Sequence, residues 1–565
     1  MGADEAPLKG TCRVLFRTTT LLLLCTLLAL SVAVLYEVLI TQQYLKNNSG
    51  SSNLPSGLSG ITDSLANILS VVNQIVYNSA VAIPLQLDTM ESTLLTAIKS
   101  LQTSDKLEPN CSWGAALIND NRYIHGINQF YFSPTEGQNL TLGPLLNIPS
   151  FIPTATTPEG CTRIPSFSLT KTHWCYTHNV ILNGCLDHVS SNQFVSMGII
   201  EPTSAGFPSF RTLKTLYLSD GVNRKSCSIS TIPGGCMMYC FVSTQSEKDD
   251  YLSAAPPEQR IIMMHYNDSI VERIINPPGV LDVWATLTPG TGSGVYYLGW
   301  VLFPVYGGVI RGTNLWNSQN NKYFISKMAS TLCKQDQATQ IANAKNSYYS
   351  SWFGDRLIQA GILACPLQRD LTNECLVLPY SNDQVMMGAE GRLYIYGDSL
   401  YYYQRGTSWW PMTMLYKLTL TFSNNQPSAI TAQNIPTQQV PRPGTGGCSA
   451  DNRCPGVCLT GVYADAWLLT DPAAVNSFGS QIIFTGSYLN SATQRINPTM
   501  YIANNTKILN SQQFGANGQG ASYGHTTCFR DTGSVNVYCI YIIEVSSSLL
   551  GQFQIVPFVR QINLN

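Results

Sequence analysis

One uncharged stretch near the start of the chain constrains the organisation of everything after it. Residues Thr18–Tyr36 read TTTLLLLCTLLALSVAVLY, 19 residues without a charge, close to the roughly 20 that a helix needs to cross a bilayer. A cleaved signal peptide is the alternative, but its apolar core usually has only about 7 to 15 residues. Lys9, Arg13 and Arg17 precede the stretch, and the next basic residue is Lys46. The positive-inside rule therefore places the N-terminus in the cytoplasm and predicts a type II membrane protein with a signal-anchor.

The predicted span divides the chain into five parts. They are a cytoplasmic tail at 1–17, a transmembrane helix at 18–37, a linker at 38–57, a helical oligomerisation stalk at 58–118 and a large extracellular head at 119–565. The sequons of the form Asn-x-Ser/Thr all follow the span, on the side where N-glycosylation occurs. The predicted glycosylation sites are Asn47, Asn110, Asn139, Asn267 and Asn504.

The cysteines agree with an oxidising compartment. The chain has 17 Cys, of which Cys12 and Cys25 precede or lie within the span. Fifteen remain, an odd number that leaves one thiol over. Cys111 is the best candidate for an interchain disulfide, because it stands alone just after the predicted helical segment. The other fourteen, from Cys161 to Cys539, could form seven intrachain disulfides, and sequence spacing does not settle their pairing.

Apolar residues after the linker recur in alternating steps of three and four, the a/d seam of a coiled coil. The first series is Leu58, Ile61, Leu65, Ile68, Val72 and Ile75. Pro84 interrupts it, and a second series follows at Leu87, Met90, Leu94, Ile98 and Leu101. We expect two stacked helical segments that join two to four chains. An amphipathic helix packed on its own head is the alternative.

From about Asn119 the pattern changes to short strand-like runs separated by Gly, Pro, Asn and Asp turns, which is typical of an all-β domain. Examples are FVSMGIIEP, TLKTLYLSDG, GRLYIYGDSLYYYQRG and NVYCIYIIEVSSSLLGQFQIVPFVR. Residues 119–565 are too many for one simple sandwich, and no linker interrupts them. A propeller of several four-stranded blades fits this length. Two consecutive sandwiches are the alternative.

Charge and motifs exclude several functions. With 32 Lys+Arg against 33 Asp+Glu, the chain has no global positive field to attract nucleic acid. It contains no HExxH, Walker A or GxSxG motif. His173 and His178 flank Cys175, and we interpret them as surface or packing residues rather than metal ligands. The remaining polar types, Arg, Glu, Asp and Tyr, suit a carbohydrate or carboxylate site, because guanidinium groups hold anions bidentately and carboxyls move protons.

Six segments stand in a fixed order after the predicted anchor and stalk. They are GCTRIPSF, NRKSCS, GAEGR, YYYQR, ATQRINP and YGHTTCFRD, which begin at Gly160, Asn223, Gly388, Tyr401, Ala492 and Tyr523. Together they resemble the paramyxovirus hemagglutinin-neuraminidases, essentially from end to end, and NRKSCS is the most specific of the six. The resemblance implies a six-bladed β-propeller sialidase head whose active site lies at the centre of its top face.

The resemblance also implies a catalytic set. Arg163, Arg405 and Arg495 match an arginine triad that clamps the carboxylate of sialic acid. Tyr523 matches the nucleophile, and Glu390 matches the carboxylate that draws off its proton. A phenol with a pKa of about 10 needs such a base at neutral pH. A neutral nucleophile also avoids pushing one anion towards another, since the attacked carbon is next to the substrate carboxylate.

Five further residues match supporting roles. Asp187 matches the general acid/base that protonates the leaving oxygen and later activates water. Glu544 matches the residue that holds the first arginine of the triad in place. Lys225, Glu247 and Tyr306 match contacts to the hydroxyls, the N-acetyl group and the glycerol chain of the sugar.

No cofactor is implied for catalysis, but the resemblance implies a structural calcium ion. Asp250 and Ser253 would be reasonable oxygen ligands for it. The resemblance also suggests seven disulfides: Cys161 with Cys185, Cys175 with Cys236, Cys227 with Cys240, Cys333 with Cys454, Cys365 with Cys375, Cys448 with Cys458, and Cys528 with Cys539.

The function implied by the resemblance is that of a viral attachment glycoprotein. It would bind sialylated host glycoproteins and glycolipids, hydrolyse terminal sialic acids as a retaining exo-alpha-sialidase, and promote membrane fusion through a viral fusion protein. Its expected location is the virion envelope and the host plasma membrane, with disulfide-linked dimers paired into a tetramer. A receptor-binding propeller without catalytic activity and a host membrane glycosidase are the alternatives, and release of free sialic acid separates the first reading from the receptor-only one.

Overall fold

The computed structural model describes most residues between 140 and 564; its larger gaps are 147–160, 310–356, 436–464 and 471–481, and shorter gaps fall between strands. The chain divides into two compact units, Met1–Pro109 and Asn110–Asn565, and all described residues belong to the second. The predicted tail, span, linker and stalk, together with Cys111, lie outside the described residues. Within the described part, no helix has the length and apolar character needed to cross a bilayer.

The described residues form antiparallel sheets, and successive groups of strands make one blade each. Blade 1 contains β2 (Cys161–Leu169), β3 (His173–Ile181), β4 (Ser191–Glu201) and β5 (Ser209–Leu218). Blade 2 contains β6 (Arg224–Ile232), β7 (Gly235–Val242), β8 (Glu258–His265) and β9 (Ile270–Ile275). Blade 3 contains β10 (Thr288–Pro289), β11 (Val295–Tyr297), β12 (Trp300–Val309), β13 (Leu357–Pro366) and β14 (Leu376–Val377). Blade 4 contains β15 (Gly391–Tyr396), β16 (Ser399–Gln404), β17 (Met414–Ser423) and β18 (Gln426–Ile435).

The last two blades share one sheet. Blade 5 contains β19 (Ala466–Leu468), β20 (Phe484–Ser491), β21 (Ile496–Ala503) and β22 (Ile508–Gln513). Blade 6 contains β23 (Gly520–Arg530), β24 (Val537–Ser546), β25 (Gln554–Leu564) and, from the other end of the described chain, β1 (Leu140–Leu146). Among the described residues, the strand pairing between the two blades is limited to Ile496 with Gly520, so we count them as two.

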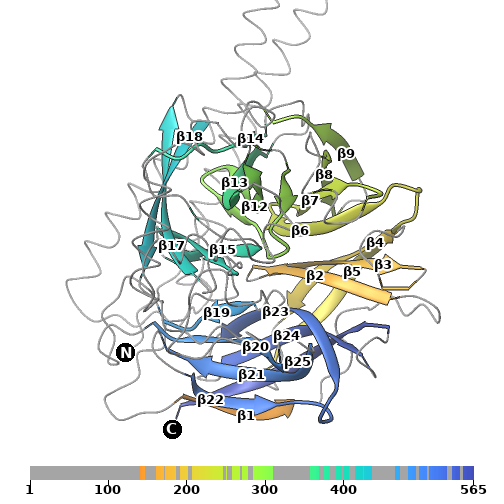
Figure 1. The fold of residues 1–565 in the computed structure, drawn as a ribbon, viewed down its shortest axis with the longest axis vertical. Helices are drawn as coiled ribbons and strands as arrows, with labels where there is room; N and C mark the ends of the chain where they lie inside the picture. Colours follow the sequence, from red (N-terminus) through yellow and green to blue (C-terminus); the bar gives the residue numbers. More distant parts are fainter. Residues whose placement is uncertain are drawn as a thin grey trace, which may run out of the picture. The chain divides into compact units, whose positions relative to one another are not determined.

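Six blades therefore follow one another around a common centre in chain order (Figure 1). The prediction of a six-bladed β-propeller is confirmed, and the alternative of two consecutive sandwiches is wrong. β1 completes blade 6 by pairing antiparallel with β25, with Leu140 opposite Leu564. This closure gives β25 a partner on both sides and makes β1 the end strand of the sheet.

Burial follows from the position of each strand in its blade. The first strands of blades 1 and 2, β2 and β6, are almost entirely buried, because neighbouring blades cover both of their faces. The fourth strands, such as β5 and β9, have many exposed positions. Strands buried on both faces read as continuous apolar or small-residue runs, whereas half-exposed strands alternate.

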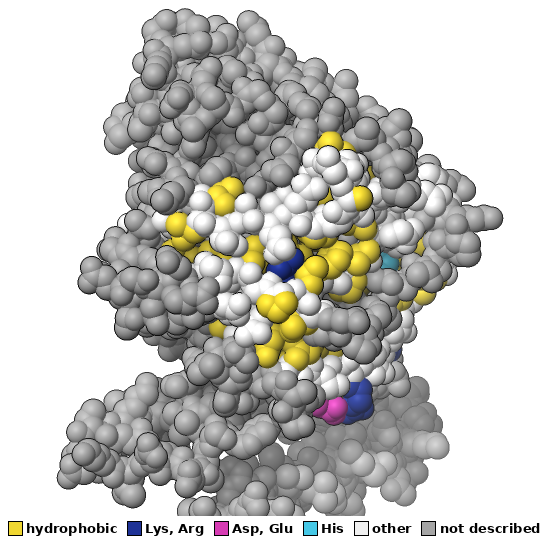
Figure 2. Space-filling view, turned by 90° about the horizontal axis from the view of Figure 1, so that it is seen from below, with side chains coloured by type: hydrophobic (Ala, Val, Ile, Leu, Met, Phe, Trp, Pro, Cys, Tyr) yellow, Lys and Arg dark blue, Asp and Glu magenta, His cyan; other side chains and the backbone are white. Residues whose placement is uncertain are grey.

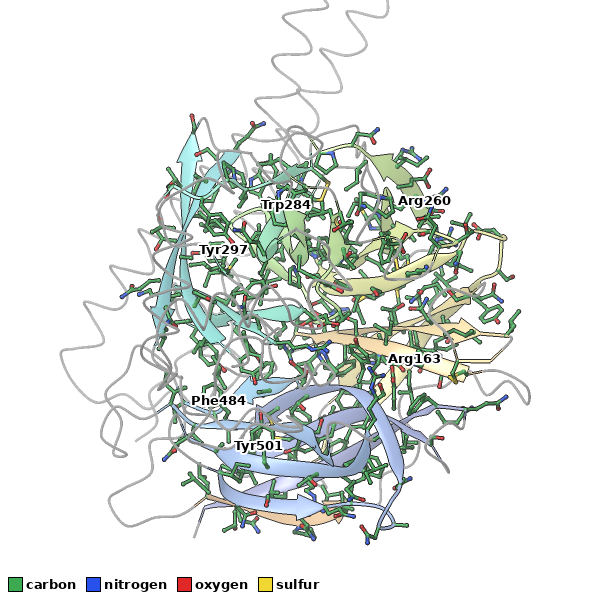
Figure 3. All side chains as sticks on the ribbon, in the orientation of Figure 1. Arg163, Arg260, Trp284, Tyr297, Phe484 and Tyr501 are labelled. Atoms are coloured by element: carbon green, nitrogen blue, oxygen red, sulfur yellow. A yellow bond between two sulfur atoms is a disulfide. The ribbon has the colours of Figure 1, made fainter. Side chains whose placement is uncertain are left out.

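The hydrophobic core lies between blades rather than inside one sheet. Phe167 and Tyr176 of blade 1 pack with Phe529 and Tyr538 of blade 6. Figure 3 shows the packed side chains that include Phe484 and Tyr501, and their cluster joins blades 4, 5 and 6. Fully burying one large apolar side chain contributes about 1.5–3 kcal/mol, so the contacts between blades hold the ring together.

The surface matches the low charge of the sequence. In the view of Figure 2, hydrophobic and uncharged polar side chains cover most of the described surface, and charged groups are few. Only 12% of the chain is charged, against roughly 25% in ordinary soluble proteins.

Five of the seven predicted disulfides are confirmed within the described residues. They are Cys161–Cys185, Cys175–Cys236, Cys227–Cys240, Cys365–Cys375 and Cys528–Cys539. Cys175 is on β3 and Cys236 is on β7, so this disulfide links blade 1 to blade 2. The other two pairs, Cys333–Cys454 and Cys448–Cys458, lie outside the described residues.

Candidate active site

Irregularities in the inner strands turn specific side chains towards the centre of the propeller. The register shifts between Arg163 and Ser166 in β2, between Lys225 and Ser228 in β6, and between Ala521 and Gly524 in β23. A bulge bends its strand and re-aims the adjacent side chain. Three predicted site residues, Arg163, Lys225 and Tyr523, therefore stand at bulges of three different blades.

The backbone at this centre takes unusual conformations. Ile164, Ser226 and Thr291 have positive φ angles of 54°, 46° and 62°. Positive φ is uncommon outside glycine, and for a β-branched residue such as Ile164 it is a genuine outlier. Such strain persists only where surrounding contacts impose it, and it clusters at functional sites.

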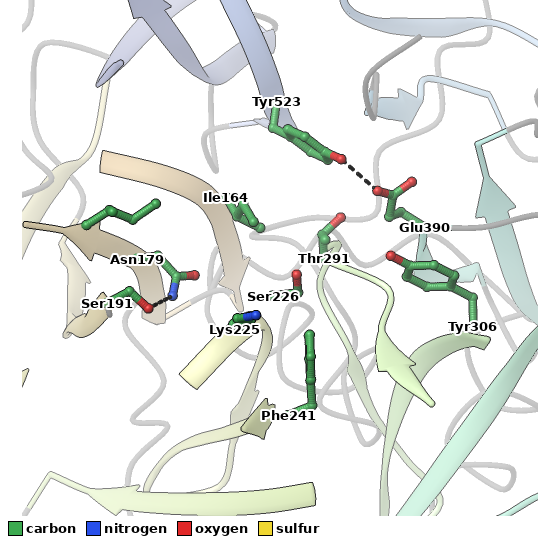
Figure 4. Close-up of a pocket in the computed structure, with 11 residues that line it drawn as sticks. Ile164, Asn179, Ser191, Lys225, Ser226, Phe241, Thr291, Tyr306, Glu390 and Tyr523 are labelled. Carbon is green, nitrogen blue, oxygen red and sulfur yellow. Dashed lines mark hydrogen bonds between the residues drawn. The ribbon is translucent and has the colours of Figure 1, made fainter. Parts of the chain in front are cut away.

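These three residues line the same pocket. Its lining comprises Ile164, Asn179, Ile181, Ser191, Lys225, Ser226, Phe241, Thr291, Tyr306, Glu390 and Tyr523. In Figure 4, Tyr523 and Glu390 lie on one side of the pocket, and Asn179 and Ser191 lie on the opposite side. Four predicted site residues, Tyr523, Glu390, Lys225 and Tyr306, are thus brought together.

Tyr523 and Glu390, which line the pocket, form a hydrogen-bonded group with Arg405. The phenol of Tyr523 donates to Oε1 of Glu390 at 2.9 Å. Nη1 of Arg405 donates to Oε2 of the same carboxylate at 2.6 Å and to the phenol oxygen at 3.3 Å. The backbone adds to this, because the N–H of Arg405 donates to the carbonyl of Glu390 at 2.8 Å. One carboxylate therefore touches both a phenol and a guanidinium.

Arg405 is fixed in its charged form. Burial lowers the pKa of its guanidinium, but the neighbouring Glu390 carboxylate and the Tyr523 phenol raise it further, and the net shift is upward. A positive charge 3.3 Å from the phenol oxygen stabilises negative charge that develops on that oxygen.

Glu544 organises the other side of Tyr523. This carboxylate is fully buried and accepts from Nε of Arg163 at 3.1 Å. It also accepts from the backbone N–H of Tyr523 at 3.2 Å and from the backbone N–H of Ile164. The predicted contact with Arg163 is present, and Glu544 also connects the bulge of β2 to the bulge of β23.

The rings and cations around Tyr523 pack closely. The guanidinium carbons of Arg163 and Arg405 lie 5.8 Å and 6.0 Å from the centre of the Tyr523 ring. Nη1 of Arg163 also donates to the carbonyl of Cys185 at 3.0 Å. Two of the three predicted triad arginines therefore flank the predicted nucleophile.

Arg495 is placed differently. It stands directly before β21 with a φ of 51°, and its carbonyl accepts from the N–H of Ala521, two residues before Tyr523, at 2.8 Å. Its side chain is exposed, and none of the three predicted triad arginines is part of the pocket lining. The structure brings its backbone next to β23, and its role as the third member of the triad stays a prediction.

Lys225 and Asp250 bear on the predicted calcium ion. Nζ of Lys225 lies 3.4 Å from Oδ2 of Asp250 and donates to the carbonyl of Gln245. Oδ1 of Asp250 accepts from the hydroxyl of Ser243 at 2.5 Å. The charge of this buried carboxylate is thus paired with an ammonium group. In the described part of the chain, no three His, Cys, Asp or Glu side chains cluster as metal ligands would, and calcium stays a prediction.

Several predicted residues lie outside the described part of the chain. They are Asp187, Glu247, Ser253, Cys111, Asn47, Asn110, Asn139 and Asn267. Asn504 is described; it directly follows β21 and is 5% exposed, and its glycosylation stays a prediction. His178 is a buried packing residue stacked on Phe194, in line with the sequence analysis.

Sequence reasoning missed most of the pocket wall. Ile164 and Ser226 directly follow Arg163 and Lys225, so the motifs CTRIPSF and NRKSCS contained them. Asn179 pairs opposite Arg163 across β2 and β3, which only the strand register reveals. Thr291 and Phe241 carried no signal that sequence reasoning could have used.

The chain matches known proteins over its full length. The family model described as Haemagglutinin-neuraminidase matches residues 11–563. The chain is similar to the hemagglutinin-neuraminidase of parainfluenza virus 5 (isolate Human/LN), with 82% identity over 565 residues and 100% of both chains covered. It is also similar to the solved ectodomain of the parainfluenza virus 5 protein, with a TM-score of 0.72, 83% identity, and coverage of 89% of this chain and 100% of that one.

A second solved structure of the parainfluenza virus 5 hemagglutinin-neuraminidase contains the ligand DANA. This chain is similar to it with a TM-score of 0.71 and 84% identity, covering 79% of this chain and 100% of that one. The resemblance seen in the six sequence segments is thus confirmed. On this evidence the chain belongs to the haemagglutinin-neuraminidase family.

Proposed function

We propose that the chain is a viral attachment glycoprotein that binds sialic acid receptors and hydrolyses terminal sialic acids. The observation that carries the proposal is the hydrogen-bonded group of Tyr523, Glu390 and Arg405, in which Tyr523 and Glu390 line the pocket. A lectin pocket has no need of a phenol held 2.9 Å from a carboxylate acceptor. Membership of the family and the DANA complex of a relative support the same substrate class, since DANA is a sialic acid analogue.

Substrate binding starts with the carboxylate of sialic acid. Arg163, Arg405 and Arg495 would hold it through charge-assisted, bidentate hydrogen bonds, which orient a planar anion better than lysine does. Arg163 is kept in one rotamer by Glu544, so little side-chain entropy is lost when the anion binds. Lys225, Glu247 and Tyr306 would contact the remaining sugar groups.

The first chemical step forms a bond between the Tyr523 oxygen and the anomeric carbon while the glycosidic bond breaks. The phenolic proton moves to Glu390 along the existing hydrogen bond, and Asp187 gives a proton to the leaving oxygen. Arg405, at 3.3 Å from the phenol oxygen, stabilises the negative charge that develops there.

The second step reverses these roles. Asp187 takes a proton from water, the water oxygen bonds to the anomeric carbon, the bond to Tyr523 breaks, and Glu390 returns its proton to the phenolate. Two displacements at one carbon retain its configuration, as in retaining glycosidases generally.

Hydrolysis of a fluorogenic sialoside by the full-length chain at mildly acidic pH tests the proposal. We expect the wild type to release sialic acid with retained configuration by NMR, and Tyr523→Phe to lose most of that turnover while still binding DANA. Because Phe removes only the hydroxyl, the fold and the ring contacts with Arg163 and Arg405 are kept. If the wild type binds sialylated cells but releases nothing, the chain is a receptor-binding propeller and these residues are ligand contacts only.

The proposal extends to the parts of the chain outside the described residues. A single span at 18–37 would anchor the chain in the virion envelope and the host plasma membrane, with the head outside. The stalk at 58–118 would join chains through Cys111 into dimers that pair as a tetramer, and would activate a viral fusion protein.

A cell–cell fusion assay tests the proposed role of the stalk separately from receptor binding and hydrolysis by the head. Polar substitutions at exposed positions between Leu58 and Leu101 should reduce fusion while receptor binding and hydrolysis continue. An equal loss of binding would show that these positions serve folding instead.

Cys111→Ser should convert the dimer band to monomer on a non-reducing gel, and a persisting dimer would exclude this cysteine as the bridge.

A further inference from the structure

A buried ion pair lies next to the candidate active site and has no part in the chemistry described above. Nη1 of Arg392 lies 2.5 Å from Oδ2 of Asp465, and both side chains are almost fully buried, at 2% and 0% exposure. Arg392 is on β15, and Glu390 directly precedes this strand, two residues before Arg392. Asp465 directly precedes β19.

The ion pair holds the strand that carries Tyr523. The backbone N–H of Thr526 donates to Oδ2 of Asp465 at 2.7 Å, and the carbonyl of Thr526 accepts from Nη1 of Arg392. Nη2 of Arg392 also reaches Oγ1 of Thr527 at 3.4 Å. Thr526 is three residues after Tyr523, so the backbone N–H and C=O of one residue of β23 are both fixed close to Tyr523 in the chain.

Backbone hydrogen bonds between strands do not fix β15 relative to β23, because the two strands belong to different sheets. Glu390 and Tyr523 thus stand on separate blades, and their relative position depends on contacts between blades. Arg392 makes a further contact of this kind, since its Nη2 donates to Oγ of Ser293 in blade 3 at 3.1 Å. One guanidinium therefore connects blades 3, 4 and 6, and Asp465 adds blade 5.

The guanidinium cannot rotate freely within this network. Its central carbon lies 4.8 Å from the ring centre of Tyr394 and 5.1 Å from that of Trp467. A planar fork packed against two aromatic rings keeps its hydrogen bonds in one geometry. A buried ion pair adds little net stability compared with apolar residues of similar volume, and a role in specifying geometry is the better-attested use.

We infer that the Arg392–Asp465 ion pair is a positioning device that sets the distance between the Tyr523 phenol and the Glu390 carboxylate. The inference rests on the proposed sialidase function. Arg392 and Asp465 do not line the pocket, and their charged groups are engaged by each other and by Thr526 and Ser293, so they act through β15 and β23 and not on the substrate. A displacement of about 1 Å between reacting groups can cost about 100-fold in rate.

Two substitutions weaken the device in different ways. Arg392→Lys keeps the charge but loses the fork, so it cannot contact Asp465, Thr526 and Ser293 together. Asp465→Asn keeps the shape of the side chain but removes its charge. We expect each to lower kcat roughly 10- to 100-fold and to change KM and the DANA inhibition constant by less than about threefold, because the pocket walls that bind the sugar remain.

Arg560→Lys is the matched control. Arg560 is an equally buried arginine, at 2% exposure, and it donates to the carbonyl of Gly143 at 2.6 Å. It lies on β25, two strands away from β23 in the sheet. We expect this variant to melt at a lower temperature with kcat unchanged.

Ser293→Ala is a milder test that removes one hydroxyl acceptor, and kcat should fall about two- to fivefold.

The experiment measures kcat, KM, DANA inhibition and melting temperature of the full-length wild type and the four variants. A fall in kcat at nearly constant KM and DANA affinity, absent from Arg560→Lys, supports the inference. Folded Arg392→Lys and Asp465→Asn proteins with kcat within twofold of wild type would overturn it, as would parallel losses of kcat and DANA affinity that also occur in the control. If those two variants fail to fold, Ser293→Ala decides on the same criterion. A folded wild type without turnover would overturn the proposed function itself, and this inference with it.

Discussion

At the scale of single residues, the site depends on buried carboxylates that make several bonds each. Glu544 accepts from the Arg163 guanidinium and from two backbone N–H groups, those of Ile164 and Tyr523. Its backbone bonds matter as much as its ion pair, since they hold the two bulges at a fixed separation. A residue expected to orient one arginine thus also orients the nucleophile.

Glu544→Gln tests this double role. The amide has one acceptor oxygen and an NH₂ group that would face the donors of Arg163 or the backbone, and leaving buried donors unpaired costs about 1–3 kcal/mol. We expect a lower melting temperature and a clear loss of sialoside turnover. Glu201→Gln is the control, because Glu201 forms an exposed pair with Arg211 at 3.1 Å and such pairs contribute little. Equal effects of the two substitutions would contradict the assignment.

His178 makes the stability of the head depend on pH. Burial lowers its pKa to about 3, and neither ring nitrogen has a hydrogen-bond partner among the described residues. In the unfolded chain a histidine has a pKa of about 6.5, so below that pH the unfolded state binds a proton that the folded state excludes. The free energy of unfolding therefore falls as pH falls, by roughly 2 kcal/mol between pH 6.5 and 5.

His178→Leu should remove this proton-binding difference. We expect melting temperatures measured from pH 7 to pH 5 to fall less steeply for the variant than for the wild type. His525, whose pKa is also lowered by burial, contributes a slope of the same sign in both proteins. Parallel curves for the two proteins would show that His178 is not a source of the acid sensitivity.

At the scale of elements, the bulges of the inner strands create the site at a measurable cost. Ile164 has a φ of 54°, where a side chain with a Cβ is strained by roughly 1–2 kcal/mol. The hydrogen bond from its N–H to Glu544 is one contact that imposes this conformation. The strain is part of what aims Arg163 at the centre.

A pair of substitutions at Ile164 measures the strain energy of its positive φ separately from the loss of its side chain. Ile164→Ala and Ile164→Gly both delete the side chain, but glycine has no strain at positive φ. We expect the glycine variant to be more stable than the alanine variant by about 1 kcal/mol. At Ile229, a buried position of β6 with no positive φ, the order should reverse, because glycine in an ordinary strand costs about 0.5–1 kcal/mol relative to alanine. Chemical denaturation of the four variants measures their free energies of unfolding. If alanine is more stable than glycine at both positions, Ile164 is not strained.

The strands were more predictable than the site. The runs FVSMGIIEP and GRLYIYGDSLYYYQRG correspond to β4 and to the hairpin of β15 and β16, because alternating apolar and β-branched residues specify strands locally. The number of blades came from the family resemblance and not from periodicity. Bulges and cross-strand neighbours such as Asn179 depend on register and tertiary contacts, which one sequence does not display.

At the scale of the whole molecule, covalent links between blades supplement the apolar contacts. Cys175–Cys236 joins blades 1 and 2 across a separation of 61 residues, whereas Cys227–Cys240 joins neighbouring strands of blade 2 across 13. Closing a longer loop restricts the unfolded chain more. The loop-entropy model gives about 4 kcal/mol for the first and about 3 kcal/mol for the second.

Paired Cys→Ala substitutions test the role of the link between blades. We expect removal of Cys175–Cys236 to lower the denaturation midpoint more than removal of Cys227–Cys240, as measured by tryptophan fluorescence in guanidinium chloride. The order should hold for the full-length chain. If removal of Cys227–Cys240 lowers the midpoint more, this disulfide within blade 2 stabilises the head more than the disulfide between blades does.

The pairing of β1 with β25 closes the ring of blades and brings the start of β1 next to the end of β25. Leu140 and Leu564 lie directly opposite each other on antiparallel strands, so a short turn could connect the end of β25 to the start of β1. The order of blades around the ring is then independent of where the chain begins. A circularly permuted head, opened instead at the exposed turn of Gly515 to Gly518 between β22 and β23, would keep every blade and the same central pocket.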